Sequence, residues 1–282
     1  MTTRRNFITT SATAAASLLA FNTSLLAASK GDKLKKIGFI SAIIKKELNE
    51  DWKTILKQTV DFGFSEIEIG NYLGDSAQRF LTYCKDIGMT PCAKGMSLTT
   101  KEDTLKKELD SINELGIKNA IIYWPWLVGG PFKLEDCKRS ANLLNKIGEI
   151  CRNTGLTLCW HNHNREFIPM EEGLPYDYLM NHTDKDLVKC EMDIYWVAKG
   201  GADPLQLLKK YTGRFKILHV KDMAPGPEQD FACPGSGIIH FQPIFKEALN
   251  QGIEHFMVEL DNCKDGMGCL KSSGNYLRNL SI

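Results

Sequence analysis

The sequence lacks an excess of charge of either sign. Its 282 residues include 35 lysines and arginines against 34 aspartates and glutamates, a formal net charge of +1. Proteins that bind nucleic acid usually carry a basic face or a strongly basic total, because they must neutralise phosphates. The balance therefore argues against a nucleic-acid partner, and against an endonuclease as the function.

Beyond residue 30 the chain also lacks long apolar runs and any linker rich in proline, glycine or serine. A membrane helix needs roughly 20 consecutive apolar residues, so the sequence predicts no membrane span in this part. Hydrophobic residues make up 43% of the chain, enough for one large core. We therefore expect a single folded domain.

The first 30 residues differ in kind from the rest. Arg4 and Arg5 precede a weakly apolar run rich in alanine, serine and leucine. Paired arginines before such a run are typical of a twin-arginine export signal, although a disordered tail is the alternative. We expect residues 1–30 to be the leader of an exported, periplasmic protein and residues 34–282 to form the fold.

The nine cysteines include no C-x-x-C pair. Exported proteins usually pair their thiols, but these cysteines are odd in number and scattered. Since twin-arginine export carries proteins that are already folded, we interpret most of them as small core residues. Cys263 and Cys269 are the one pair suspected of forming a disulfide.

Past residue 33, short apolar runs alternate with helical patterns. Between the runs, apolar residues recur at spacings of three and four, as at Trp52, Ile55, Leu56 and Val60, which is typical of amphipathic helices. Strands are predicted over residues 37–40, 67–69, 91–96, 120–124, 156–160, 188–194, 215–220 and 256–260. Eight such units in about 250 residues predict one α/β domain, a (β/α)₈ TIM barrel. An open doubly wound sheet is the alternative, but no G-x-G-x-x-G follows the first strand.

Metal-competent or titratable side chains end each of the last four strands, where this fold places its catalytic groups. They are His161 and His163, then Glu191 and Asp193, then His219 and Lys221, and finally Glu259. Side chains alternate along a strand, so the two members of each pair point to one face. Two imidazoles and two carboxylates suit one divalent cation, Mn²⁺, Zn²⁺ or Co²⁺. A polar rim without metal is the alternative.

Several segments in this order resemble the xylose isomerase-like TIM-barrel family of sugar-phosphate isomerases and epimerases, in particular its exported bacterial branch. They are HNHNREF, EMDIYW, LHVKDM, GSGIIHF and VELDN, with a closing SSGNYLRNL. The resemblance covers about residues 34–282 and implies one divalent metal ion held by a glutamate, an aspartate, a histidine and a second glutamate. By position, Asp193, His219 and Glu259 are the last three. His161 stands where the first glutamate would be.

This departure changes the expected proton chemistry. The resemblance implies that two metal-bound glutamates exchange protons on opposite faces of an enediolate, which is doubtful with His161 as a ligand. His163 lies on the same strand face, and an ordinary imidazole pKa near 6.5 suits proton abstraction. We expect His163 to be the general base, with Glu259 as the rival.

The remaining expected roles concern substrate. Lys221 would stabilise the oxyanion or, as an equal alternative, pair with Asp222 or Glu191. Tryptophan rings would cover the apolar faces of a sugar, although most tryptophans are core residues. The expected substrate contacts are Glu68, Trp124, Trp126, Glu166 and Trp196.

The sequence thus predicts a metal-dependent sugar isomerase or epimerase that enolises a small-molecule sugar or keto-sugar. One alternative is a 3-keto-glycoside lyase of the same fold, which the histidine at position 161 and the export signal slightly favour. Another is a non-catalytic periplasmic sugar-binding barrel. Metal identity, substrate and oligomeric state stay open, with a homodimer as one alternative.

Overall fold

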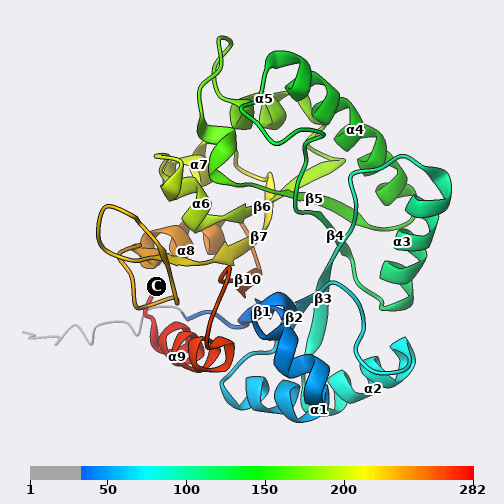
Figure 1. The fold of residues 1–282 in the computed structure, drawn as a ribbon, viewed down its shortest axis with the longest axis vertical. Coiled ribbons are helices and arrows are strands. Elements are labelled where there is room, and N and C mark those ends of the chain that lie inside the picture. Colours follow the sequence, from blue (N-terminus) through cyan, green and yellow to red (C-terminus); the bar gives the residue numbers. More distant parts are fainter. Residues whose placement is uncertain (1–32) are drawn as a thin grey trace, which may run out of the picture. The chain divides into compact units, whose positions relative to one another are not determined.

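The computed structural model describes residues 33–282, so the predicted leader at residues 1–30 lies outside the described part. Eight parallel strands form a closed barrel in the order β1-β10-β7-β6-β5-β4-β3-β2 (Figure 1). These strands are β1 (Gly38–Ile40), β2 (Glu66–Ile69), β3 (Thr90–Gly95), β4 (Asn119–Ile122), β5 (Thr157–His161), β6 (Val188–Asp193), β7 (Phe215–Val220) and β10 (His255–Val258). The predicted (β/α)₈ barrel is confirmed, with each strand within two residues of its expected bounds.

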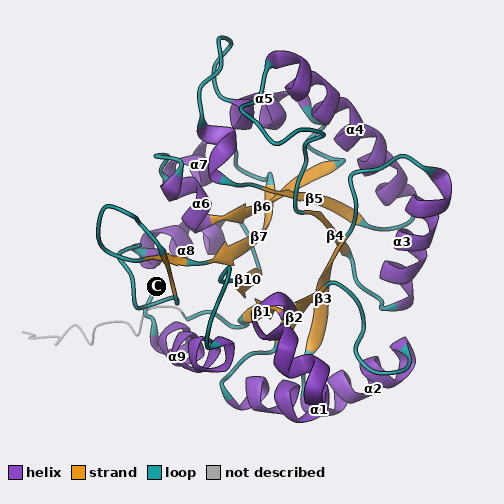
Figure 2. Cartoon of the chain, viewed as in Figure 1, coloured by secondary structure: helices purple, strands orange, loops and turns teal. Residues whose placement is uncertain are grey.

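Helices surround the barrel on the outside (Figure 2). The α-helices are α1 (Lys45–Asp61), α2 (Ala77–Ile87), α3 (Glu102–Glu114), α4 (Leu134–Asn153), α5 (Pro175–His182), α6 (Ile194–Lys199), α7 (Pro204–Lys210), α8 (Phe241–Asn250) and α9 (Gly266–Asn279). Two 3₁₀ helices follow β1 and β5: η1 (Ser41–Ile44) directly, and η2 (Asn164–Phe167) after two residues. Between residues 33 and 282, no helix is long and apolar enough to cross a membrane.

Helix α2 shows how local sequence sets the boundaries. The Ser76 side chain accepts a hydrogen bond from the Arg79 backbone N–H, which satisfies one of the free donors at the helix start. At the other end Gly88 adopts φ +77°, a left-handed conformation that ends the helix and costs glycine little. The sequence signals for helix ends are therefore local and readable.

The core has two parts. A small cluster fills the inside of the barrel below the C-terminal mouth: Cys92, Ala93, Ile121, Cys159, Ile217 and Met257. A much larger cluster packs the outer faces of the strands against the helices, as expected for strands buried on both sides. This apolar inner layer packs beneath the polar groups of the mouth and supports them.

The loop between β7 and α8 contains structure that the sequence does not announce. A short antiparallel ribbon, β8 (Asp222–Met223) with β9 (Phe231–Ala232), stands at its start. The Asp222 carboxylate accepts hydrogen bonds from four backbone N–H groups of this loop, those of Met223, Gly235, Gly237 and Ile239. Asp222 is therefore the internal anchor of the loop.

A disulfide joins Cys233 in this loop to Cys269 in α9, with a Cα–Cα distance of 5.5 Å. The suspected pair Cys263–Cys269 is wrong, because the folded-back loop brings Cys233 to Cys269 and leaves Cys263 as a free thiol. Six other cysteines are buried free thiols, in agreement with their interpretation as core residues: Cys84, Cys92, Cys137, Cys151, Cys159 and Cys190.

Candidate active site and metal centre

Four side chains that the sequence assigns to a metal lie together at the C-terminal mouth of the barrel. Each of His161, Asp193, His219 and Glu259 offers one ligand atom, and these atoms all lie within 4.8 Å of one another. His161 and Asp193 end β5 and β6, His219 lies near the end of β7, and Glu259 follows β10. Asp193 and His219 are register partners, so neighbouring strands aim them at the same point.

The converging atoms of these residues are held by ionic contacts. Asp193 Oδ2, His219 Nδ1 and Glu259 Oε2 are buried and make no regular hydrogen bond. Their near neighbours are charged groups: Lys221 Nζ lies close to both carboxylate oxygens, and Glu259 Oε2 lies 3.5 Å from His219 Nδ1. Nitrogen and oxygen donors in this number fit a divalent cation.

Lys221 brings a positive charge among these groups. Its Nζ lies 2.6 Å from Glu259 Oε2, 3.1 Å from Asp193 Oδ2 and 2.7 Å from Asp261 Oδ2. Burial would lower the pKa of Lys221, but the carboxylates outweigh burial and raise it above its usual range. The expected partners Asp222 and Glu191 are not its partners, because Asp222 is taken up by backbone N–H groups and Glu191 faces the two histidines.

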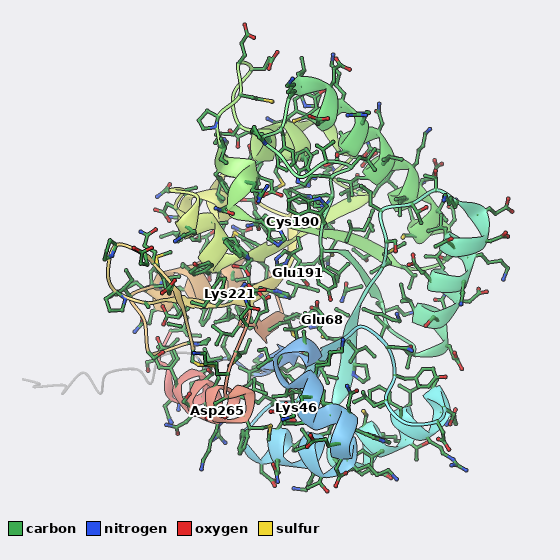
Figure 3. All side chains as sticks on the ribbon, in the orientation of Figure 1. Lys46, Glu68, Cys190, Glu191, Lys221 and Asp265 are labelled. Carbon is green, nitrogen blue, oxygen red and sulfur yellow. A yellow bond between two sulfur atoms is a disulfide. The ribbon has the colours of Figure 1, made fainter. Side chains whose placement is uncertain are left out.

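Two further carboxylates, Glu191 and Glu68, lie inside the barrel next to these residues (Figure 3). Glu191 Oε1 is 3.0 Å from His161 Nδ1 and 3.1 Å from His219 Nε2, so a single oxygen contacts both imidazoles. Glu68 Oε2 is 3.2 Å from His219 Nε2, and the Tyr123 hydroxyl donates to Glu68 Oε1. Each histidine thus uses one ring nitrogen below and keeps the other for the mouth, an arrangement typical of metal-binding histidines.

Burial and charge shift the titration of this whole group. Burial lowers the pKa of His161 well below its usual value, so this imidazole is neutral. Burial, followed by the charge of Glu68, raises the pKa of Glu191 well above its usual range. For Glu259, burial would raise the pKa, but Lys221 outweighs it and keeps the pKa well below the usual value. At neutral pH the Glu259 carboxylate is therefore charged and the His161 imidazole is neutral.

His163 lies beside the four residues and not among them. Its ring is 5.0 Å from the His161 ring, and its buried Nδ1 has no hydrogen-bond partner. Burial first, and the charge of Lys221 second, lower the pKa of His163 to about 4. The imidazole is therefore neutral and available as a proton acceptor at neutral pH, although it is a weaker base than an ordinary histidine.

Two of the expected tryptophans flank His163. The Trp124 ring lies 5.3 Å and the Trp196 ring 5.5 Å from the imidazole, and both are half-buried. Trp196 also lies 5.1 Å from Lys221 Nζ, which is surrounded by the rings of Tyr195 and Phe231 as well. These rings wall the mouth on one side.

The expected substrate contacts Trp126 and Glu166 are placed differently. The Trp126 indole N–H donates to Glu166 Oε1 at 2.7 Å, and the His163 backbone N–H donates to Glu166 Oε2 at 2.9 Å. Both side chains are buried, and Trp126 stacks on Phe132. These hydrogen bonds hold the loop that carries His163. Because the polar atoms of both side chains already have partners within the protein, the two residues are not free to contact substrate. Glu68, also expected to contact substrate, lies below the site against His219.

Sequence reasoning placed Glu191 at a strand end but not among the site residues, and it gave no role to Tyr123 or Asp261; these three complete the site. The signal that could have found two of them is the alternation of side chains along a strand. Glu191 stands two positions before Asp193, and Asp261 stands two positions after Glu259. Alternation predicts the shared face. It does not say which of two inward carboxylates points to a metal and which to a neighbouring histidine.

Comparisons with known proteins agree with this fold. An inosose dehydratase from Clostridium botulinum (strain Alaska E43 / Type E3) is 30% identical over 143 residues, which cover 45% of this chain and 47% of that protein. The chain thus spans about half the length of the curated relatives it matches. A sugar phosphate isomerase/epimerase from Parabacteroides distasonis ATCC 8503 superposes with a TM-score of 0.75 at 26% identity, over 90% of this chain and 96% of that one.

A crystal structure of the IOLI protein with a bound zinc atom has the same fold, with a TM-score of 0.68 at 17% identity over 88% of this chain and 99% of that chain. The model of the xylose isomerase-like TIM barrel family matches residues 56–277, most of the barrel. The chain therefore belongs to the xylose isomerase-like TIM barrel family.

Proposed function

We propose that the protein is a divalent-metal-dependent enzyme that enolises a sugar or keto-sugar, with isomerisation or epimerisation as the outcome. The observation that carries this proposal is the convergence of four buried or nearly buried ligand atoms at the mouth, one each from His161, Asp193, His219 and Glu259, all within 4.8 Å of one another. Membership of a family whose relatives include sugar phosphate isomerases/epimerases and dehydratases supports it.

His161, Asp193, His219 and Glu259 would hold the metal ion. Bound there, a divalent ion supplies a Lewis acid that makes a C–H bond beside a carbonyl more acidic, a contribution of several kcal/mol. One structural neighbour, the IOLI protein, was crystallised with a bound zinc atom, so zinc is the first of the candidate ions to test. Glu191 and Glu68 would keep both imidazoles in the orientation that ligation needs.

His163 is the proposed proton acceptor. Its Nδ1 is unpaired, it stands between two aromatic rings, and its lowered pKa keeps it neutral at the pH of most bacterial environments. General bases work best with a pKa near the operating pH, so the buried His163 is a weaker base than an ordinary histidine. Glu259 remains the rival base.

Lys221 is proposed to stabilise the oxygen that gains negative charge. Its ammonium group is buried and permanently charged, and it lies between the two carboxylates Asp193 and Glu259. Preorganised cations in a site with little water are among the strongest contributors to catalysis. The aromatic rings of Tyr195, Trp196 and Phe231 keep this ammonium in place.

Elimination is the second candidate outcome, because a curated relative is a dehydratase. On a 3-keto-glycoside, the proton beside the carbonyl would go to the base and the C–O bond at the next carbon would break. The aglycone oxygen would then take the proton, so that an enone and an alcohol result without any oxidant. Epimerisation and elimination share the first proton transfer.

Deuterium exchange tests the shared step. Protein supplied with Mn²⁺ or Zn²⁺ is incubated in D₂O with a panel of ketohexoses and methyl 3-keto-β-D-glucoside, and deuterium at the carbon beside the carbonyl is followed by NMR. We expect exchange with at least one probe and none with His219→Ala. Sugar binding without exchange, at full metal content, would instead support the sugar-binding alternative.

We also propose that the protein is exported. Arg4 and Arg5 before an apolar run support this location, and so does the disulfide Cys233–Cys269, because disulfides persist mainly in oxidising compartments. Fractionation of cells that express the full chain should place it in the periplasm. The double variant Arg4→Lys, Arg5→Lys should stay in the cytoplasm. Equal distribution of the two proteins would contradict the proposal.

A further inference from the structure

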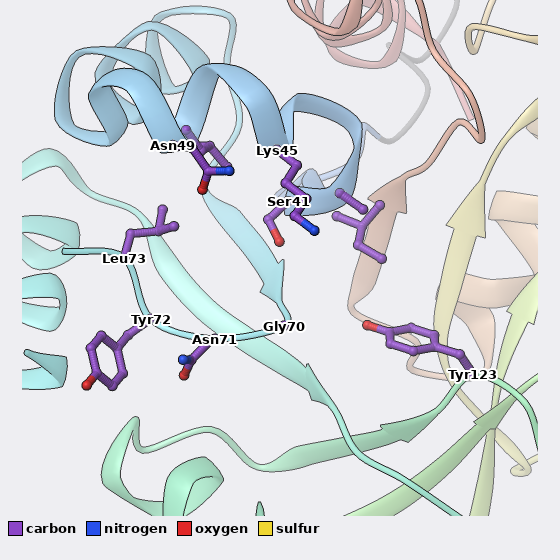
Figure 4. A pocket seen from close by; sticks show the side chains of 11 residues that line it. Ser41, Lys45, Asn49, Gly70, Asn71, Tyr72, Leu73 and Tyr123 are labelled. Carbon is purple, nitrogen blue, oxygen red and sulfur yellow. The ribbon is translucent and has the colours of Figure 1, made fainter. Parts of the chain in front are cut away.

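A cavity of about 360 Å³ opens between η1, the start of α1 and the loop after β2 (Figure 4). Its lining residues are Ile40, Ser41, Ala42, Lys45, Leu48, Asn49, Gly70, Asn71, Tyr72, Leu73 and Tyr123. Because Ile40 and Gly70 come at the C-terminal ends of β1 and β2, the cavity lies at the same end of the barrel as the candidate metal centre.

Tyr123 connects the cavity to the centre. The residue lines the cavity, its hydroxyl donates to Glu68, and Glu68 in turn contacts His219 at 3.2 Å. The Tyr123 ring also lies edge-on to the His161 ring, with 6.0 Å between centroids. Tyr123 thus borders both the cavity and the layer of residues that contacts the metal ligands.

The cavity walls favour an uncharged ring. Ile40 and Leu48 are buried apolar lining residues, and Tyr72 and Leu73 line the cavity from the β2–α2 loop. Mostly apolar walls with a few hydroxyl or amide groups are typical of sites for small uncharged ligands. A sugar or phenol ring offers both an apolar face and polar edges, which match such walls.

The charges of the lining make a phosphate group a poorer match. Lys45 is the one charged residue among the eleven that line the cavity, and it is exposed. Tight phosphate sites usually combine several charge-assisted hydrogen bonds from Arg, Lys or backbone N–H groups. One flexible lysine beside the amides of Asn49 and Asn71 provides far less than that.

We propose that this cavity is a subsite for an uncharged ring linked to the reacting sugar, so that the substrate is a glycoside and not a free or phosphorylated monosaccharide. This inference rests on the proposed function, because it places the reacting sugar at the metal centre. The cavity then selects substrates by their aglycone, while the centre performs the proton transfer.

The test compares two probes that differ only in the aglycone, methyl and phenyl 3-keto-β-D-glucoside. Dissociation constants are measured by calorimetry, and deuterium exchange is measured on the same samples. The wild type should bind the phenyl glycoside at least tenfold more tightly than the methyl glycoside. Ala42→Trp, which fills the cavity from η1, should reduce this ratio to about one and leave the methyl glycoside within twofold of its wild-type affinity.

Lys46→Trp is the matched control, because Lys46 is exposed and adjacent to the lining residue Lys45 but does not line the cavity. This variant should keep the tenfold preference. Equal binding of the two probes, or a preference that Ala42→Trp leaves intact, would overturn the subsite. If exchange continues in that case, the proposed function survives without it.

Two further outcomes separate the proposals. Preferential binding of the phenyl glycoside without any exchange would support the subsite and contradict the enolisation chemistry. Inorganic phosphate that competes with the phenyl glycoside in the wild type, but not in Lys45→Ala, would identify a phosphate subsite and overturn the preference for an uncharged ring.

Discussion

Both ends of the barrel place a histidine against a buried glutamate, yet the two ends differ in what remains unsatisfied. At the N-terminal end, Glu66, Cys92 and His255 lie close enough to hold a metal, within 4.8 Å of one another. There His255 Nδ1 contacts Glu66 Oε2 at 2.9 Å, and Lys36 Nζ contacts Glu66 Oε1 at 3.4 Å. Both oxygens of the Glu66 carboxylate have partners within the protein, so we expect no metal ion at this end of the barrel.

The C-terminal end has similar residue types but a different pattern of hydrogen bonds. Three atoms that point to the common centre make no regular hydrogen bond and have only ionic neighbours, and the opposite nitrogens of His161 and His219 are already engaged by Glu191. The comparison shows that closeness of metal-competent residues is a weak criterion. The number of converging buried ligand atoms that make no hydrogen bond is the more selective one.

The largest expected effect is on metal binding at the two ends. His219→Ala should abolish stoichiometric binding of Mn²⁺ or Zn²⁺, because it removes a ligand and the link to Glu191. His255→Ala, the matched variant at the N-terminal end, should keep one ion per chain. Equilibrium dialysis followed by metal analysis measures both, with circular dichroism to show that each variant is folded. Two ions in the wild type, or loss of the ion in His255→Ala, would contradict the assignment of the metal to the C-terminal end alone.

The contrast also explains what the sequence could predict. Strand alternation is local, so the barrel, its strand bounds and the inward direction of Asp193, His219 and Glu259 could be read from the sequence. The role of Glu191 could not, because it depends on the register that sets it beside His161 in β5 and near His219 in β7. That register is decided by packing across the whole barrel.

Loop side chains were the least predictable part of the site. Trp124 and Trp126 stand two positions apart in one loop, yet Trp124 flanks His163 while Trp126 is buried against Glu166. Loops have no fixed period that assigns a face to each residue. The pairing of Cys233 with Cys269 escaped prediction for the same reason, since it depends on how a long loop folds back.

The second prediction separates ligands from the base within the C-terminal end. His163→Ala should lower turnover and deuterium exchange by a factor of about 10² to 10⁴, the usual contribution of a general base. Metal content should stay at one ion, because the His163 ring lies beside the four ligands and not among them. If His163→Ala keeps full exchange while a metal-retaining Glu259→Gln loses it, the proton goes to Glu259.

The third prediction compares the two glutamates that contact histidines. Glu191→Gln should weaken metal affinity by about 10- to 100-fold, because one Glu191 oxygen orients both imidazoles and increases their basicity. Glu66→Gln, which changes the carboxylate that contacts His255, should leave metal affinity unchanged. Competition titrations with a chelating dye measure both. Equal affinity in Glu191→Gln and wild type would show that the Glu191 carboxylate has no influence on the ligands.

The smallest expected effect is on stability, and it too should come from the C-terminal end. Burial raises the pKa of Glu166 from the ordinary 4.5 to about 7, although hydrogen bonds from Trp126 and the His163 backbone oppose the shift. Between these two values the folded protein binds more protons than the unfolded chain. The free energy of unfolding therefore falls as pH rises through this window, and the contribution of Glu166 is lost above about pH 7.

From pH 5 to pH 8 this loss should amount to about 2.5 kcal/mol, since one pKa unit corresponds to about 1.4 kcal/mol. Glu166→Gln should remove that part of the pH dependence, because the amide does not titrate. Glu171→Gln, an exposed carboxylate in the same loop, should keep it. Urea titrations of the three proteins at both pH values measure the difference. A slope that is unchanged in Glu166→Gln would mean that Glu166 is charged in the folded protein, with its two hydrogen bonds strong enough to offset burial.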